Sequence, residues 1–166
     1  DRDGDEGRCQ MTGRITHERF TLERRYDATP AQIFAAWKDV EGRTQWQKPA
    51  DHLHLVYDAD DFRVGGRDIS RCWADGDANA YEAVVCYQDI VPDRRIIMSE
   101  TVSLAGRNLS SALATVEIDP DGSGARMRLT LQIAAETGSD IFAGYREGWG
   151  ALLENLVSHL TRETIP

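Results

Sequence analysis

The sequence predicts an α+β fold in which a curved antiparallel sheet of six to seven strands wraps one long C-terminal helix. Three observations carry this prediction. A strand-like run over residues 15–26 is followed by short helical segments. Further strand-like runs between residues 53 and 134 are separated by turn-forming residues, a spacing typical of an antiparallel meander. The last periodic segment, from about residue 139 to residue 160, has the spacing of an amphipathic helix.

The first strand and two short helices are predicted near the start of the chain. Residues 15–26 alternate loosely between polar and apolar side chains, which indicates a strand. The next stretch predicts a helix, because Thr29 suits the N-cap and Pro30 suits the first helical position. A second short helical turn is expected over residues 43–46.

The middle of the chain predicts the remaining strands of the sheet. Loops rich in Gly, Asp, Asn and Pro separate them, as turns require. The Gly65–Gly66 pair predicts a bulge or sharp bend rather than a phosphate-binding loop. The expected strands are residues 53–57, 62–73, 81–90, 96–104, 110–118 and 127–134.

The final helix carries an apolar stripe from Phe142 to Leu160. Gly144, Gly148 and Gly150 crowd its first half, and each costs a helix about 0.5–1 kcal/mol relative to alanine. Three such residues require a compensating reason. We expect the sheet or a bound ligand to approach the helix backbone closely at Gly148.

The length and the net charge of the chain limit the classes of protein to which it can belong. The 166 residues suit one domain, expected over residues 14–163 after a flexible tail of residues 1–13. The net charge of −9 argues against nucleic acid and anionic membrane surfaces as partners. No apolar run approaches the roughly 20 residues that span a bilayer, so we expect no membrane insertion. The three cysteines lack CxxC spacing and suit a reducing compartment, which favours a cytoplasmic protein.

Several stretches of the sequence resemble a known family. They are RRYDATPAQIFAAWKD, TQWQKP, DFRVGG, YQDIVPDRRI, SSALATVEIDPDGSG and the terminal GW and LLENL. In this order they resemble the START-like (SRPBCC) helix-grip superfamily, and within it the group related to the C-terminal domain of the Hsp90 ATPase activator (AHSA-type). The resemblance covers about residues 15–160. It implies a helix-grip, Bet v1-like fold whose sheet and final helix enclose a cavity, often used for small hydrophobic molecules.

Glu100 falls among apolar positions of an expected strand. Met98 and Val102 share its parity, so Glu100 points inside if this parity faces the helix. A buried carboxylate is costly unless it has a partner. Three interpretations stay open: a ligand-facing group, a structural pair with Arg71 or Arg63, and a solvent-facing residue at a bulge.

Arg71 and the aromatic residues supply the other candidates for a binding site. Arg71 shares a parity with Trp73, where it either holds an acidic head group against an aromatic wall or is an exposed cross-strand arginine. Some of the aromatic side chains belong to the core, and others suit a cavity wall. The expected ligand-binding residues are Trp46, Arg71, Trp73, Tyr81, Met98, Glu100, Tyr145 and Trp149.

No motif in the sequence indicates a metal or a cofactor. His52 and His54 form an H-x-H pair, but no second His or Cys cluster completes a metal site. The sequence contains no GxSxG, GxGxxG, P-loop or HExxH motif. We therefore expect neither a metal nor a cofactor, and we assign no catalytic residue.

The sequence favours the binding of a small hydrophobic or amphipathic molecule between the sheet and the final helix. One alternative is a cofactor-independent enzyme of the polyketide cyclase or hydratase type, with Glu100 as general acid or base. The other is an Hsp90-activator-like interaction module, which the resemblance implies. The sequence names no ligand and leaves a homodimer open.

Overall fold

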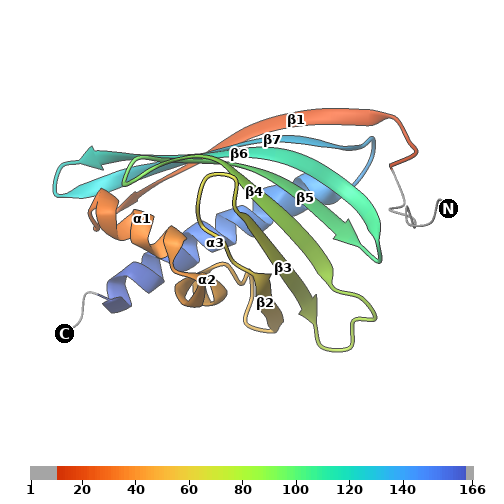
Figure 1. Cartoon of the computed structure of the whole chain (residues 1–166), viewed down its shortest axis with the longest axis horizontal. Coiled ribbons are helices and arrows are strands. Elements are labelled where there is room, and N and C mark those ends of the chain that lie inside the picture. Colours follow the sequence, from red (N-terminus) through yellow and green to blue (C-terminus); the bar gives the residue numbers. More distant parts are fainter. Residues whose placement is uncertain (1–10, 164–166) are drawn as a thin grey trace.

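The computed structural model describes residues 11–163. Within them, seven strands form one antiparallel sheet in the order β1-β7-β6-β5-β4-β3-β2. The sheet curves over α3, which crosses its concave face, while α1 and α2 cover the end where α3 finishes (Figure 1). The predicted α+β fold is confirmed. The elements are β1 (Ile15–Tyr26), α1 (Pro30–Lys38), α2 (Val40–Trp46), β2 (Leu53–Ala59), β3 (Arg67–Ala74), β4 (Tyr81–Val91), β5 (Arg95–Leu104), β6 (Arg107–Asp121), β7 (Gly124–Glu136) and α3 (Ile141–Glu163).

The expected N-terminal tail, residues 1–13, lies mostly outside the described residues. Just before β1, the backbone amides of Thr12 and Gly13 donate hydrogen bonds of 2.9 and 3.3 Å to Oε1 of Glu136. The division into a tail and a domain of residues 14–163 stays a prediction. Among the described residues, no helix is both long and apolar enough to cross a membrane.

The two short helices begin at side-chain caps. Thr29 Oγ1 accepts a hydrogen bond from the Gln32 amide, and Gln32 Oε1 accepts one from the Thr29 amide. This capping box confirms the N-cap predicted at Thr29. Asp39 accepts from the amides of Glu41 and Gly42 and caps α2, which begins earlier than the sequence indicated. These caps satisfy backbone amides in the first turn of each helix.

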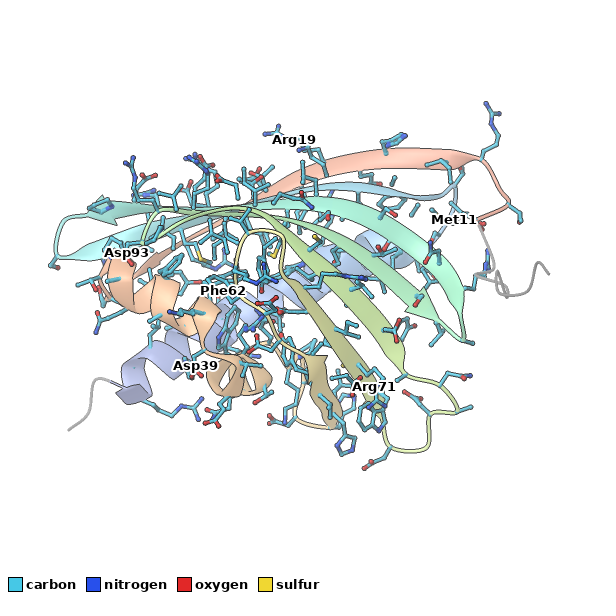
Figure 2. The ribbon with its side chains drawn as sticks, viewed as in Figure 1. Met11, Arg19, Asp39, Phe62, Arg71 and Asp93 are labelled. Atoms are coloured by element: carbon cyan, nitrogen blue, oxygen red, sulfur yellow. The ribbon has the colours of Figure 1, made fainter. Side chains whose placement is uncertain are left out.

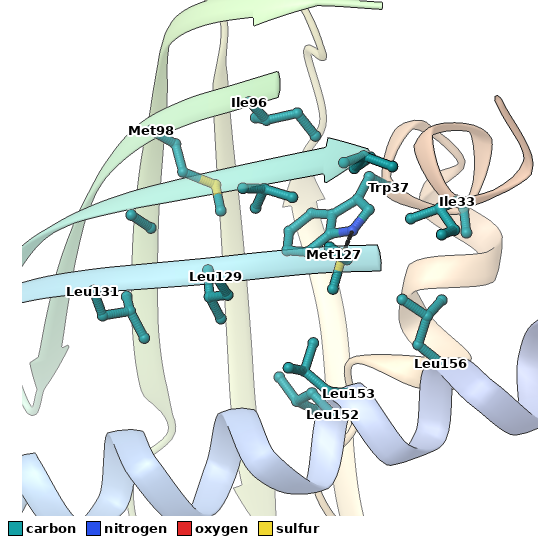
Figure 3. Close-up of a cluster of buried hydrophobic side chains, with 14 of the residues drawn as sticks. Ile33, Trp37, Ile96, Met98, Met127, Leu129, Leu131, Leu152, Leu153 and Leu156 are labelled. Carbon is teal, nitrogen blue, oxygen red and sulfur yellow. Dashed lines mark hydrogen bonds between the residues drawn. The ribbon is translucent and has the colours of Figure 1, made fainter. Parts of the chain in front are cut away.

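The core fills the space between the sheet and the helices. Met127 and Leu129 on β7 face Leu153 and Leu156 on α3 (Figure 3). Trp37 from α1 closes this cluster, and its Nε1 donates a hydrogen bond of 3.3 Å to the Met127 sulfur. Each fully buried side chain of this kind contributes about 1.5–3 kcal/mol to stability. This cluster occupies the half of the interior that lies next to α1.

One strand is shorter than the sequence predicted. Residues 62–64 form a loop, and β3 begins only at Arg67. Gly65 has a φ of +79°, and a Cβ on Gly66 would lie 2.0 Å from the carbonyl oxygen of Asp61. A side chain at either glycine is therefore excluded or strained. The glycine pair makes the predicted bend, and the bend ends the strand pairing.

Candidate functional site

A pocket of about 580 Å³ opens between α3 and strands β3, β4 and β5. Apolar and aromatic side chains dominate its lining, such as Val102 on β5 and Trp149 and Leu152 on α3. Among the described residues that line it, the charged ones are Asp77 and Glu147, both acidic. Its volume falls in the range of about 300–1,000 Å³ that is usual for small-molecule sites.

Two glycines of α3 form part of this wall. Gly144 and Gly148 line the pocket, and a Cβ added to either would meet no atom within 4 Å beyond its own helix backbone and chain neighbours. Gly150 also faces open space but does not line the pocket. The expected close approach of the sheet to Gly148 is therefore wrong, because the space beside it belongs to the pocket. The approach of a ligand there stays a prediction.

A smaller cavity of about 50 Å³ adjoins the pocket and shares Ser70, Ala83 and Trp149 with it. Glu100 and Met98 line this cavity from β5. Their shared parity therefore faces the interior, which excludes the solvent-facing interpretation of Glu100. The cavity gives the apolar pocket a polar extension beneath the sheet.

Glu100 is held by a tyrosine rather than by Arg71 or Arg63. The hydroxyl group of Tyr145 donates a hydrogen bond of 2.9 Å to Glu100 Oε1 and lies 3.0 Å from Oγ of the fully buried Ser110. Because the tyrosine proton points to the carboxylate, the serine hydroxyl group donates to the tyrosine oxygen. Burial raises the pKa of Glu100 above its ordinary value, and the hydrogen bond from Tyr145 offsets part of this shift. The site thus favours the neutral carboxyl group.

A buried arginine forms another wall of the smaller cavity. Arg43 on α2 is 3% exposed, and its Nη1 donates to Asp68 at 2.5 Å and to the Tyr87 hydroxyl group at 3.1 Å. Its Nη2 donates to Asp60 at 2.5 Å. The Tyr87 hydroxyl group donates to the same Asp68 oxygen at 2.5 Å. Among the described residues, Arg43 Nε has no hydrogen-bond partner.

The sequence did not single out this Arg43 network. Arg43 lies in a short polar helix, and an arginine in such a helix is usually exposed to solvent. Asp68, however, shares its strand parity with Ser70 and Cys72, which line the pocket. The inward direction of this parity is the signal that points to Asp68.

Six of the expected ligand-binding residues line the two cavities. Trp73, Tyr81, Tyr145 and Trp149 line the larger pocket, and Met98 and Glu100 line the smaller one. Trp149 lines both cavities and also stacks on a core tryptophan, so it contributes to the wall and to the core. The structure therefore brings together residues from β4, β5 and α3 that lie far apart in the sequence.

Two expected residues, Trp46 and Arg71, line neither cavity, and Trp73 makes other contacts besides the pocket. Trp46 is 1% exposed and packs in the core. Arg71 lies on the outer side of β3 (Figure 2), where it makes hydrogen bonds of 2.5 and 2.8 Å to Asp58. Trp73 borders the pocket, but its ring stacks on His54 with centroids 5.3 Å apart, and Arg71 lies over it. Arg71 is thus an exposed cross-strand arginine rather than part of this cavity.

A curved antiparallel sheet that grips a long C-terminal helix, with a pocket between them, defines a helix-grip domain. The chain belongs to the family described as Activator of Hsp90 ATPase homolog 1-like protein, whose model matches residues 27–161. The match begins just before α1 and runs nearly to the end of α3. It therefore includes all the residues that line the two cavities.

Solved structures share this fold. A protein from Rhizobium loti is 35% identical to this chain, over 88% of this chain and 99% of that one, with a TM-score of 0.78. A protein from Rhizobium leguminosarum is 29% identical, over 90% and 97%, with a TM-score of 0.79. The AHSA1 protein from Silicibacter pomeroyi is 24% identical, over 88% and 99%, with a TM-score of 0.72, and shows the shared fold. A search of curated proteins found no match.

Proposed function

We propose that the protein binds a small hydrophobic or amphipathic molecule between α3 and strands β3 to β5. The observation that carries this proposal is the pocket of about 580 Å³ with its mainly apolar lining. Burial of apolar ligand surface there contributes about 25 cal/mol per Å². The adjoining smaller cavity supplies polar groups that orient the ligand.

The glycines of α3 support this function. Side chains at Gly144 and Gly148 would occupy space that belongs to the pocket. A bare helix face is costly for the helix but keeps this space open. The pocket therefore accounts for two of the three glycines that crowd the first half of the helix.

Two matched variants test the proposal by titration with an uncharged fluorescent hydrophobic dye such as Nile red and with a panel of neutral amphiphiles. Gly148→Leu fills the pocket and should lower the affinity at least about tenfold, whereas Gly150→Leu should bind like the wild type. Both substitutions raise helix propensity by about 0.5–1 kcal/mol, so an unfolded helix does not explain a difference between them. Equal binding by the two variants, or no saturable binding by the wild type, would overturn the proposal.

Glu100 favours a second candidate, a cofactor-independent enzyme of the polyketide cyclase or hydratase type. A carboxyl group that lines a cavity and has a raised pKa suits general acid–base catalysis near neutral pH. Product formation from a panel of polyketide-like and enone substrates tests this candidate. Turnover that Glu100→Gln abolishes would support an enzyme, and binding without turnover would reject it for that panel.

The family description supplies a third candidate, an Hsp90-activator-like interaction. It predicts that the purified protein raises the ATPase rate of Hsp90 and that Gly148→Leu leaves this effect unchanged, because the variant alters the pocket rather than an outer surface. An unchanged ATPase rate over a full titration would reject this candidate.

A further inference from the structure

The charges around the two cavities are unfavourable for an anionic ligand. The charged residues that line the larger pocket are Asp77 and Glu147, within the part of the chain that the structure describes. Among the described residues that line the smaller cavity, the cationic side chain is Arg43, which is already bonded to Asp60 and Asp68. A carboxylate or phosphate head group would therefore meet carboxylates and an arginine whose charge is already neutralised.

Two residues that line the smaller cavity, Arg43 and Glu100, each have a polar atom whose hydrogen-bonding capacity is not used. Arg43 Nε is buried without a partner among the described residues. Glu100 accepts a hydrogen bond at Oε1 from Tyr145, and no described residue bonds to its Oε2. A neutral Glu100 carries its proton on this second oxygen and becomes a donor. Both unused groups are thus donors. A buried donor without a partner is costly, and Arg43 Nε is such a donor.

We propose that the bound molecule carries an uncharged hydrogen-bond acceptor, a ketone or a similar carbonyl oxygen, which enters the smaller cavity and accepts from Arg43 and Glu100. Its apolar body fills the larger pocket. The volume of about 50 Å³ has room for such a group, since one water-sized atom needs about 10–15 Å³. This inference rests on the proposed binding function and names the chemical class of its ligand.

The surroundings of Glu100 keep it a donor. Burial raises its pKa, so the neutral form persists to a higher pH than for an exposed carboxyl group. Arg43 does not favour ionisation strongly, because Asp60 and Asp68 balance its charge. Burial also raises the pKa values of the tyrosines there, which stay protonated. The titratable groups that line this cavity with Glu100 are Arg43 on α2, Tyr57 on β2, Asp68 on β3 and Tyr87 on β4. Tyr145 on α3 bonds to Glu100 from the larger pocket.

Four probes with the same phenyl-alkyl body test the ligand class by calorimetry or dye displacement at pH 6. They are benzylacetone (a ketone), hydrocinnamate (a carboxylate), phenylpropylamine (an ammonium) and butylbenzene (a hydrocarbon). Benzylacetone should bind about tenfold more tightly than butylbenzene, and hydrocinnamate should bind most weakly. Equal affinities, or tightest binding of the carboxylate or the amine, would overturn this inference and leave the binding function intact. Failure of every probe and of the dye would overturn both.

Two variants of Glu100 separate hydrogen-bond donation from charge. Glu100→Gln keeps a donor without a charge and should retain the preference for benzylacetone, whereas Glu100→Leu should lose it. In the wild type the preference should fall as rising pH ionises Glu100, and in Glu100→Gln it should not change with pH. Thermal unfolding confirms that both variants fold. A loss of preference in Glu100→Gln as complete as in Glu100→Leu would overturn the inference.

Discussion

The hydroxyl group of Tyr145 on α3 donates a hydrogen bond of 2.9 Å to Oε1 of Glu100 on β5. This bond joins the final helix to the middle of the sheet beside the smaller cavity, and Ser110 on β6 extends it at 3.0 Å. These three polar side chains lie on otherwise apolar faces of three elements, and each supplies a hydrogen-bond partner for another. The first two predictions follow from this arrangement.

Tyr145→Phe should destabilise the protein by about 1–3 kcal/mol, because it leaves Ser110 and Glu100 without their shared partner in the interior. The free energy of unfolding in urea measures this loss. Tyr81→Phe removes a hydroxyl group from a side chain that is 46% exposed and should change stability little. Equal stabilities of the two variants would contradict the role given to the Tyr145 hydroxyl group.

Glu100→Gln should change how stability depends on pH. The folded-state pKa of Glu100 lies above its ordinary value of 4.5, so the folded protein binds this proton more tightly than the unfolded chain does. The stabilisation is fully present below pH 4.5 and is lost as the pH rises through the raised pKa, with a slope of at most about 1.4 kcal/mol per pH unit. Relative to Glu100→Gln, the wild type should therefore lose stability as the pH rises above 4.5. Urea unfolding at several pH values tests this prediction, and a constant difference between the two proteins would reject it.

Arg43→Met should destabilise the protein by about 3–5 kcal/mol, since it leaves Asp68 buried without its cationic partner. Chemical denaturation measures the effect, and circular dichroism checks that the variant folds. Arg63→Met removes an arginine from an exposed ion pair with Asp61 and serves as the control, with little change expected. A small effect of Arg43→Met would show that Asp68 relaxes into contact with water.

Cys72 provides a probe of pocket occupancy. It lines the larger pocket, and burial, together with the charge of Asp77, raises the pKa of its thiol. Iodoacetamide should therefore alkylate it slowly at neutral pH, because the thiolate is the reactive form. A bound ligand should slow the reaction further, whereas Cys86, which lines neither cavity, should react at the same rate with and without ligand. Peptide mass spectrometry separates the two sites, and equal protection of both would contradict a ligand in this pocket.

Local patterns in the sequence predicted most of the fold. The N-cap at Thr29 and the bend at Gly65 depend on backbone chemistry within a few residues, and both are confirmed. Alternation along β5 predicts that Glu100 shares a face with Met98 and Val102, and the structure shows that this face is inward. The strand predicted over residues 62–73 is wrong at its start, because the bend at the glycines ends the pairing before residues 62–64.

The site was less predictable, because its groups meet only through the packing of distant elements. Arg43 and Asp68 are 25 residues apart in the sequence, and no local pattern relates them. Arg71 and Trp73 share a parity along β3 with the apolar Ile69, which favoured an inward direction for all three. The inward face of this strand instead carries Ser70 and Cys72. Alternation predicts which residues share a face but not which face is covered.

The sequence by itself determined the order of the elements, the caps and bends between them, the apolar stripe of the final helix and the family, because each depends on neighbouring residues or on motifs in a fixed order. Only the tertiary structure decided that Tyr145 is the partner of Glu100, that Arg43 is buried between two carboxylates, and that the glycines of α3 face an open pocket. These features depend on how closely α3 and α2 approach the curved sheet. That distance results from the packing of side chains across the whole core.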